Sequence, residues 1–151
     1  HCRKGDRMIR EIRRDELDAL LELYLHLHED GIPENNAHLH EIWDTICSDE
    51  NHHIIVCEVD GRLVSSCVCV IIPNLTRNIR PYAFIENVVT HADYRGMGYA
   101  TACLDYARDL AKAANCYKMM LLTGSKDEKT LHFYQHAGYN CTDKTAFIQW
   151  L

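Results

Sequence analysis

The residues with the most distinctive chemistry lie where an apolar run meets a turn with two close glycines. Arg95, Gly96 and Gly98 follow the run 82–90 and come just before a long helical pattern. Because glycine lacks a Cβ, its backbone approaches an anion closely, and the first amide groups of a helix have no partners inside the helix. The helix dipole and the Arg95 guanidinium both add positive charge there. This combination predicts a cradle for a diphosphate group.

Spacing excludes two other phosphate-binding motifs at this turn. The chain contains no G-x-x-x-x-G-K-[ST] sequence, so the nucleoside-triphosphate site of a kinase or NTPase is not expected. A dinucleotide-binding fingerprint needs a third glycine where Thr101 stands, and an acidic residue about 20 positions later, where Lys118 stands. The pattern that remains is R-x-x-G-x-A, formed by Arg95, Gly98 and Ala100.

Hydrophobic periodicity places this turn within one α+β domain. Strands are predicted over 8–13, 53–59, 62–72, 82–90, 118–123 and 146–150, and helices over 15–25, 36–49, 100–114 and 127–136. Asp15 is the predicted N-cap of the first helix, and Leu39, Ile42, Trp43 and Ile46 are the predicted buried stripe of the second. Asp60-Gly61 is typical of a two-residue type I′ hairpin, and 73–81 is a polar loop. The order β-α-α-β-β-β-α-β-α-β indicates a mixed layer rather than a doubly wound sheet.

Composition limits the classes of protein and partner. The chain has 151 residues, 47% hydrophobic and 25% charged, as expected for one soluble domain. No apolar stretch approaches the ~20 residues that cross a bilayer and no secretory leader is recognised, so we expect a cytoplasmic protein without a membrane partner. Acidic residues outnumber basic ones 22 to 16, which disfavours nucleic acid as a partner. We interpret residues 1–7 as a cloning remnant or an extension, and 8–151 as the domain.

Neither the eight cysteines nor the ten histidines form a recognisable metal site. No C-x-x-C pair occurs, and most cysteines stand in apolar runs, where a free thiol acts as a small hydrophobe. His132 and His136 share a helix face, but no third ligand of matching spacing accompanies them. We therefore expect reduced thiols and no bound metal.

The R-x-x-G-x-A turn and a second block together resemble the GNAT family of N-acetyltransferases. The acetyl-CoA motif of that family is [QR]-x-x-G-x-[GA] in the same strand–turn–helix setting. Phe133, Tyr134, Gly138 and Tyr139 look like its F-Y-x-x-x-G-F/Y ending. The resemblance covers residues 8–151, and 84–139 is most similar to glucosamine-phosphate-type and aminoalkyl-type acetyltransferases. It implies a mixed, mostly antiparallel central sheet flanked by helices, and acetyl-CoA as the cosubstrate.

The resemblance also implies roles for individual residues. The backbone of Val88, Val89 and Thr90 would bond the pantetheine arm like an added strand. The diphosphate would be held at the turn, whose residues are Arg95, Gly96, Met97, Gly98, Tyr99, Ala100 and Thr101. Thr130 and Phe133 complete the predicted cofactor-binding set.

Three of these positions leave alternatives open. Tyr134 matches the tyrosine that the family places near the acetyl sulfur, with a core aromatic as the alternative. Family members commonly carry an asparagine shortly before this tyrosine, where Asp127 or Thr130 stands here. The bulky Tyr99 is expected either to pack inward or to shield the phosphates.

Acetyl transfer to an amine needs two proton movements. An alkylammonium group has a pKa near ~10 and must lose a proton before it attacks the thioester, and the leaving thiolate is better protonated. Glu86 is the candidate base, because a charged residue within an apolar run is otherwise costly, and Tyr134 is the candidate acid. The alternative for Glu86 is to bind substrate or pair with an arginine. By strand alternation it shares a face with Val88 unless a bulge intervenes.

We predict transfer by direct attack in a ternary complex on a primary amine of a small molecule or peptide. The acceptor is expected between the loop 74–80 and the first two helices. An acyl-cysteine route through Cys103 or Cys116 is disfavoured, because neither thiol has a paired base. The alternative function is a non-catalytic acyl-CoA-binding sensor or interaction module, which needs the turn but neither Glu86 nor Tyr134. Dimerisation is common in similar proteins, so a homodimer is a further hypothesis, although no interface is identified by sequence.

Overall fold

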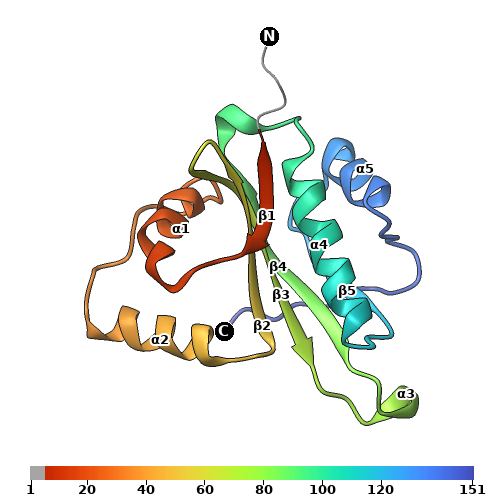
Figure 1. Ribbon diagram of the computed structural model, residues 1–151. Helices are drawn as coiled ribbons and strands as arrows, with labels where there is room; N and C mark the ends of the chain where they lie inside the picture. Colours follow the sequence, from red (N-terminus) through yellow and green to blue (C-terminus); the bar gives the residue numbers. More distant parts are fainter. Residues whose placement is uncertain (1–5) are drawn as a thin grey trace.

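A five-stranded sheet forms the centre of the fold (Figure 1). This computed structural model describes residues 6–151. The strands are β1 (Arg7–Glu11), β2 (His52–Val59), β3 (Arg62–Ile72), β4 (Tyr82–Thr90) and β5 (Met119–Leu121). They lie in the order β1-β2-β3-β4-β5, with antiparallel pairing from β1 to β4 and parallel pairing between β4 and β5. The predicted mixed, mostly antiparallel sheet is confirmed.

Helices cover both faces of this sheet (Figure 1). One side carries α1 (Leu17–Tyr24) and α2 (Ala37–Ser48), and the other carries α4 (Tyr99–Ala113) and α5 (Glu128–His136). Short helical turns, η1 (Arg14–Glu16), α3 (Thr76–Ile79) and η2 (Ala92–Tyr94), join the longer elements. The observed order therefore agrees with the predicted one from the first strand to the last helix.

An apolar core fills each side of the sheet. In β2, Ile54 and Val56 face α1 and α2, whereas Ile55 and Cys57 face α4, as the two-residue period of a strand requires. We call these the α1-side core and the α4-side core. Every cysteine among the described residues is free, and four of them are fully buried as small apolar side chains: Cys57, Cys67, Cys69 and Cys103.

The hairpin between β2 and β3 has the predicted turn. Asp60 and Gly61 have φ angles of 51° and 78°. Both are positive, as a type I′ turn requires, and Val59 pairs directly with Arg62. The prediction from Asp60-Gly61 is confirmed.

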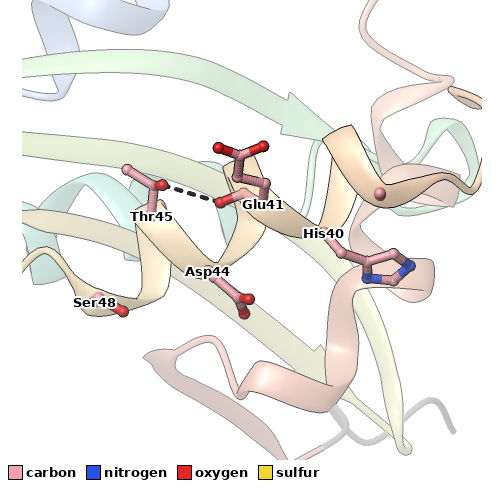
Figure 2. Close-up of a pocket in the computed structure, with 6 residues that line it drawn as sticks. His40, Glu41, Asp44, Thr45 and Ser48 are labelled. Atoms are coloured by element: carbon pink, nitrogen blue, oxygen red, sulfur yellow. Dashed lines mark hydrogen bonds between the residues drawn. The ribbon is translucent and has the colours of Figure 1, made fainter.

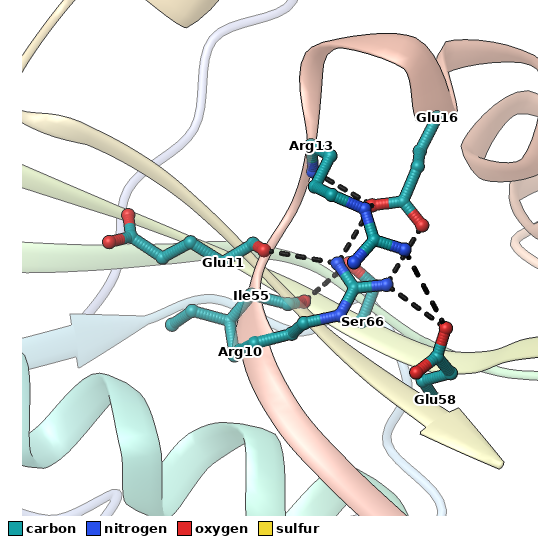
Figure 3. A network of polar contacts seen from close by, with 7 residues as sticks. All are labelled: Arg10, Glu11, Arg13, Glu16, Ile55, Glu58 and Ser66. Carbon is teal, nitrogen blue, oxygen red and sulfur yellow. Dashed lines mark hydrogen bonds and ion pairs between the residues drawn. The ribbon is translucent and has the colours of Figure 1, made fainter. Parts of the chain in front are cut away.

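Arg10 ties β1 to β2 and to the start of the first helical segment (Figure 3). Its guanidinium donates to both carboxylate oxygens of Glu16, at 2.7 and 2.9 Å, and to Oε1 of Glu58 at 3.3 Å. Glu16 also accepts the backbone N–H of Arg13, at 2.8 Å. The pKa of the Glu16 carboxyl is lowered to about 2, mainly by the hydrogen bonds from the Arg10 guanidinium. These contacts determine where the chain turns from β1 towards α1.

The predicted last strand, 146–150, does not form. Residues 140–151 are exposed coil, and Phe147 and Trp150 are 91% and 86% exposed. Alternating apolar side chains favour a strand, but a strand also needs an edge to pair with. No strand among the described residues of this chain receives the segment.

Smaller differences concern the ends of elements. Asp15 lies inside η1, and α1 has no side-chain cap, so the predicted N-cap is wrong; Glu16 accepts the backbone N–H of Arg13 at the start of η1. In α2, Trp43 is buried, whereas Ile42 is 46% exposed. Residues 1–5 of the predicted extension lie outside the described residues, and Arg7 already pairs with Val59 in β1.

Two predicted stretches differ in extent. β5 is shorter than the predicted strand 118–123, because it pairs with β4 through three residues only. The predicted polar loop 73–81 contains α3, where Arg77, Asn78 and Ile79 have φ angles of 54°, 61° and 63°. The loop is therefore ordered by a left-handed turn.

Candidate active site

The second half of β4 has a free edge. β4 pairs with β5 only through Ala83, Phe84 and Ile85, after which β5 ends. From Glu86 onward, the edge that faces away from β3 has no strand partner among residues 6–151. Unpaired backbone groups on such an edge can bond an extended ligand as if it were another strand. The stretch Val88–Thr90, predicted to receive the pantetheine arm, lies along this edge.

A β-bulge at Asn87 decides which way the side chains of β4 point. The register of β3 and β4 shifts between Ser66, which pairs with Val89, and Val68, which pairs with Glu86. Asn87, on the β4 side of this shift, has a φ of 51°. Glu86 is therefore exposed on the side of α1 and α2, whereas Val88 packs against the α4-side core. The expectation from simple alternation, that Glu86 and Val88 share a face, is wrong because one extra residue reverses the pattern.

The glycine turn leaves the beginning of α4 without a cap. Gly96 and Gly98 have φ angles of 74° and 82°, a region that other residues enter at a cost. Gly98 is the N-cap residue, and the first helical bond runs from the Ala102 N–H to the Gly98 carbonyl, at 3.0 Å. No side chain caps the helix and its first turn holds no acidic residue. The amide groups there point out of the helix end with the positive pole of its dipole, as an anion site requires.

The side chains of the turn have distinct positions. Arg95 is exposed, and its Nε donates to the Thr90 carbonyl at 3.3 Å, which holds the guanidinium beside the end of β4. Tyr99 is only 5% exposed and belongs to the α4-side core. Of the two alternatives for Tyr99, the structure therefore has inward packing.

Arg7 is a second cation at this turn, which the sequence did not reveal. Its Nη1 lies 3.9 Å from the position that a Cβ on Gly98 would take. No carboxylate among residues 6–151 forms an ion pair with Arg7. An unpaired guanidinium beside the positive end of a helix is unfavourable unless an anion lies between them. No sequence signal could identify Arg7, because its neighbour Gly98 lies 91 positions along the chain.

The second block forms α5 and the approach to it. Asp127 is the N-cap of this helix, and its carboxylate accepts the Lys129 N–H at 3.3 Å. The Thr130 hydroxyl lies 3.3 Å from the Ser125 hydroxyl. Phe133 packs against the α4-side core and contributes no polar group. Asp127 therefore has a structural role as the cap of α5. The Thr130 hydroxyl lies near the surface of the protein.

Tyr134 is held in an aromatic cluster over the α4-side core. Its ring centroid lies 5.0 Å from that of Phe133 and 6.2 Å from that of Tyr139, and both pairs meet edge to face. Burial, and then the neighbouring Cys67, raise the pKa of the Tyr134 hydroxyl. Because the ordinary pKa of tyrosine is already about 10, the hydroxyl is protonated at neutral pH and can donate a hydrogen bond.

Tyr24, at the end of α1, approaches the bulge from the α1 side. The sequence patterns did not identify it as a residue of the candidate site. Its hydroxyl interacts with the Asn87 side chain, and burial raises its pKa to about 12. Tyr24 packs against the α1-side core, whereas Tyr134 packs against the α4-side core. In the sequence, Tyr24 is one of the apolar positions of a helix, and its polar contact with β4 leaves no local signal.

The cysteines are unsuited to an acyl-enzyme route. Cys103 is fully buried, and burial raises its pKa to about 12. Burial also raises the pKa of Cys116. Because the thiolate is the nucleophile, both groups are poor candidates for covalent chemistry.

Two surface hollows lie away from this junction. The larger, about 600 Å³, lies over α2, and Figure 2 shows His40, Glu41 and Asp44 projecting from that helix. The smaller, about 380 Å³, is lined by residues from the end of β1, the end of α2 and the start of β2. Neither is lined by Glu86, Tyr134 or the glycine turn, so neither is the candidate active site.

The described part of the chain has neither a metal-binding cluster nor a membrane-spanning helix. Within residues 6–151, no three or more His, Cys, Asp or Glu side chains are grouped so as to hold a metal ion. No helix in the same range is long and apolar enough to span a membrane.

Comparison with known proteins identifies the family. Residues 17–139 match the family model of the acetyltransferase (GNAT) family. The chain belongs to this family and is an acetyl-CoA-dependent acyltransferase. The resemblance drawn from the two sequence blocks is therefore confirmed.

Individual relatives agree with this assignment. The chain is 30% identical over 140 residues to a glucosamine 6-phosphate N-acetyltransferase of Trypanosoma brucei brucei, with 92% of each chain covered. It matches the structure of a putative acetyltransferase from Agrobacterium tumefaciens str. C58 with a TM-score of 0.87 at 35% identity, over 95% of this chain and 99% of that one. An aminoglycoside N-acetyltransferase solved with CoA shares the fold at 15% identity, with a TM-score of 0.74 over 95% of this chain and 99% of that one.

Proposed function

We propose that this protein transfers the acetyl group of acetyl-CoA to a primary amine of a small molecule or peptide, by direct attack in a ternary complex. The observation that carries the proposal is the arrangement along β4. Its free edge leads into the uncapped start of α4, and the bulge turns Glu86 to the face opposite the α4-side core. One end of this path suits a diphosphate, and the other brings a carboxylate to the point where an amine arrives.

The turn and its neighbours fit the diphosphate of CoA. The amides of Gly96 to Thr101 supply donors, and Arg95 and Arg7 supply charge from two sides. The free edge of β4 at Val88–Thr90 then receives the pantetheine arm through backbone hydrogen bonds. Together these contacts direct the thioester towards the bulge and leave the opposite face open to the acceptor.

Two side chains carry the protons in this proposal. Glu86, exposed on the side of α1 and α2, accepts a proton from the acceptor ammonium, directly or through one water. The neutral amine forms the bond to the thioester carbonyl carbon, and the carbon–sulfur bond breaks. Tyr134, whose hydroxyl is protonated at neutral pH, donates its proton to the leaving thiolate. Tyr24 stabilises the bulge between them through its contact with Asn87.

Glucosamine 6-phosphate is the first acceptor to test. Support comes from the glucosamine 6-phosphate N-acetyltransferase of Trypanosoma brucei brucei, to which this chain is 30% identical over 92% of both chains. An amino sugar phosphate has the amine that the reaction needs and an anionic group. Arg77, in the loop before β4, lies over the Tyr117 ring and is the candidate cation for that anion, whereas Arg80 already donates to the carbonyls of Asn115 and Cys116. Polyamines, aminophosphonates, amino acids and peptides with a free amine form the rest of the panel.

The test is formation of N-acetylated product, measured by mass spectrometry, with acetyl-CoA and each amine in turn. The proposal expects one acceptor class to react far faster than thioester hydrolysis without amine. It also expects Glu86→Gln and Tyr134→Phe to slow product formation while acetyl-CoA still binds. If no amine gives product although acetyl-CoA binds, the catalytic proposal fails and the acyl-CoA sensor is favoured.

A further inference from the structure

Two histidine rings meet where the chain after α1 touches the end of β4. His26 follows α1, whereas His91 follows β4 and is the N-cap residue of η2. The two ring centroids lie 4.1 Å apart, at an interplanar angle of 40°. From His91 the chain continues through η2 into the glycine turn that begins with Arg95. The pair therefore joins the α1 side of the sheet to the turn proposed to hold the diphosphate.

Each of the two rings accepts a backbone N–H from the start of η2. The Nδ1 atom of His91 accepts the Asp93 N–H at 3.1 Å. The Nδ1 atom of His26 accepts the Ala92 N–H at 3.3 Å. A ring nitrogen accepts a hydrogen bond only through a lone pair, and a doubly protonated imidazole has none. Both contacts therefore require the neutral form of the ring.

Arg62 approaches the other nitrogen of the His91 ring. This arginine begins β3, and its Nη2 lies 2.9 Å from Nε2 of His91. Its guanidinium also lies over the Tyr94 ring, 5.9 Å from the ring centroid. A neutral imidazole has a single lone pair, which the Asp93 amide and the Arg62 guanidinium both approach. A second proton on the His91 ring would therefore face a hydrogen-bond donor at each nitrogen.

The charges around the His91 ring also favour its neutral form. The Asp93 carboxylate is the negative group there, but its Oδ2 lies 4.0 Å from Nδ1 and its side chain is 82% exposed. An ion pair in water contributes little at that distance. Burial lowers the pKa of His91, and the nearby positive groups lower it further, whereas Asp93 offsets them only in part. The titratable and charged groups that face the ring from the elements around it are His26, Arg62, Asp93, Tyr94 and Arg95.

We propose that His26 and His91 are positioning residues for the diphosphate turn, and that they hold it only while both rings are neutral. The inference rests on the proposed placement of CoA at this turn. The two amides that the rings fix lie in η2, which leads directly into Arg95 and Gly96, so they set the direction in which the turn begins. Protonation releases these amides, and binding of the diphosphate must then order η2 again.

The lowered pKa of His91 gives the sign of the pH dependence. A released turn binds the proton with the ordinary pKa of about 6.5, whereas the ordered turn binds it only at lower pH. The ordered turn therefore loses stability as the pH falls below about 6.5, and the loss levels off below the pKa of the ordered ring. The affinity for CoA is expected to decrease over the same range.

Calorimetric measurement of the Kd for CoA, from about pH 5.5 to about pH 8, tests the proposal. His91→Asn is the matched variant, because asparagine accepts the Asp93 N–H as a cap but does not titrate. The ratio of the wild-type Kd to the His91→Asn Kd is expected to rise from near 1 at the upper pH to about 5 at the lower. The phosphates of CoA also titrate, at roughly pH 6, but their effect cancels in this ratio. His38→Asn, an exposed position of α2, is the control and should follow the wild type.

NMR of the chain without CoA tests the same contacts independently of binding. The His91 ring is expected to titrate below its ordinary pKa of 6.5, and the Asp93 amide signal should shift with the same midpoint. Arg62→Gln removes a positive charge beside the ring and should raise that midpoint. His26→Ala removes the second acceptor and should raise the Kd for CoA about 5-fold near pH 8. Circular dichroism confirms that each variant folds.

Several outcomes would overturn the inference. A Kd ratio that stays constant over the pH range does so, and so does a His91 ring that titrates at or above its ordinary pKa. A ratio that falls below 1 in acid would mean that the imidazolium attracts the diphosphate, which is the opposite of the proposal. Gly98→Ala separates this failure from that of the proposed function. Unchanged CoA affinity in Gly98→Ala refutes the placement of CoA at the turn, whereas weakened affinity together with a constant ratio refutes only the role of the histidines.

Discussion

Glu86 and Tyr134 lie on opposite sides of the sheet. Glu86 is exposed on the side of α1 and α2, and Tyr134 packs on the side of α4. In the proposed reaction, the amine and the thioester meet in the gap beside β4, with the proposed base and the proposed acid on different sides of the sheet. This separation allows each proton to move without the two side chains competing for the same place.

Glu86→Gln is the sharpest test of the base. The amide has the same shape but cannot accept a proton, so kcat is expected to fall by roughly 10²–10⁴-fold with little change in the Kd for acetyl-CoA. Steady-state kinetics and calorimetry measure the two quantities. Glu41→Gln, on the exposed face of α2, is the control and should retain full activity. An unchanged kcat in Glu86→Gln means that this carboxylate is not the base.

Arg7→Gln tests the second cation at the turn. Loss of a charge beside the diphosphate is expected to raise the Kd for CoA by about 10-fold, corresponding to about 1.4 kcal/mol. Isothermal titration calorimetry gives the Kd directly. Arg108→Gln, which removes an exposed charge from the middle of α4, should bind CoA as the wild type does. Equal affinities of wild type and Arg7→Gln would place Arg7 outside the binding site.

The elements determine how these side chains are presented. The glycine turn leaves the first amides of α4 free, and the bulge directs Glu86 away from the core of α4. The Arg10–Glu16 bridge fixes the start of α1, whose last residue, Tyr24, contacts the bulge. A substitution that changes the backbone of any of these elements is therefore expected to displace residues of the candidate site.

Gly98→Ala and Gly61→Ala separate backbone strain from ligand binding. Both glycines have positive φ angles, 82° and 78°, so alanine at either position should destabilise the fold by about 1 kcal/mol. Only Gly98 lies at the turn proposed to hold the diphosphate, so only Gly98→Ala should weaken CoA binding. Thermal unfolding and calorimetry of both variants provide the comparison. Equal CoA affinities of the two variants would contradict the assigned position of the diphosphate.

Glu16 makes stability depend on pH in the acid range. Its pKa is lowered to about 2 from an ordinary value of 4.5, mainly by Arg10, so the unfolded chain binds this proton more readily than the folded one. The stabilisation is present above about pH 5 and is lost as the pH falls towards 2. Glu16→Gln should lower the free energy of unfolding by about 1 to 3 kcal/mol at pH 7. Urea unfolding at several pH values should show the two proteins converging near pH 2, and parallel curves would contradict the bridge.

At the scale of the whole molecule, the sheet separates two cores that share the same strands. β2 and β3 contribute buried side chains to both, so we expect the two cores to unfold together. The fully buried thiols of Cys57, Cys67, Cys69 and Cys103 lie in the α4-side core. The reactivity of these thiols towards a labelling reagent is therefore expected to increase only when the whole sheet unfolds.

Cysteine labelling measures that cooperativity. In native buffer, Cys141 is expected to react quickly with a thiol reagent, because it is exposed. The four buried thiols should react together, at a rate that rises with urea as the global unfolding equilibrium does. Peptide mass spectrometry identifies the labelled sites. Rapid labelling of Cys67 or Cys103 in native buffer would contradict the shared core.

Local patterns were sufficient for much of this protein. Period-two and period-3.6 hydrophobic patterns, Asp60-Gly61 and the spacing of Arg95, Gly98 and Ala100 depend only on residues close in sequence. They therefore predicted the sheet strands up to β5, the helices, the hairpin and the cradle. They did not predict the bulge at Asn87, because an extra residue is visible only against the register of a neighbouring strand.

Only the tertiary structure determined the features that depend on contacts between segments far apart in the sequence. The side of the sheet on which Glu86 lies depends on pairing with β3, and the position of Arg7 depends on β1 meeting the start of α4. The contact between Tyr24 and Asn87 joins residues 63 positions apart. The segment 146–150 has the side chains of a strand, yet pairing is a property of two edges, so its local pattern alone could not place it in the sheet.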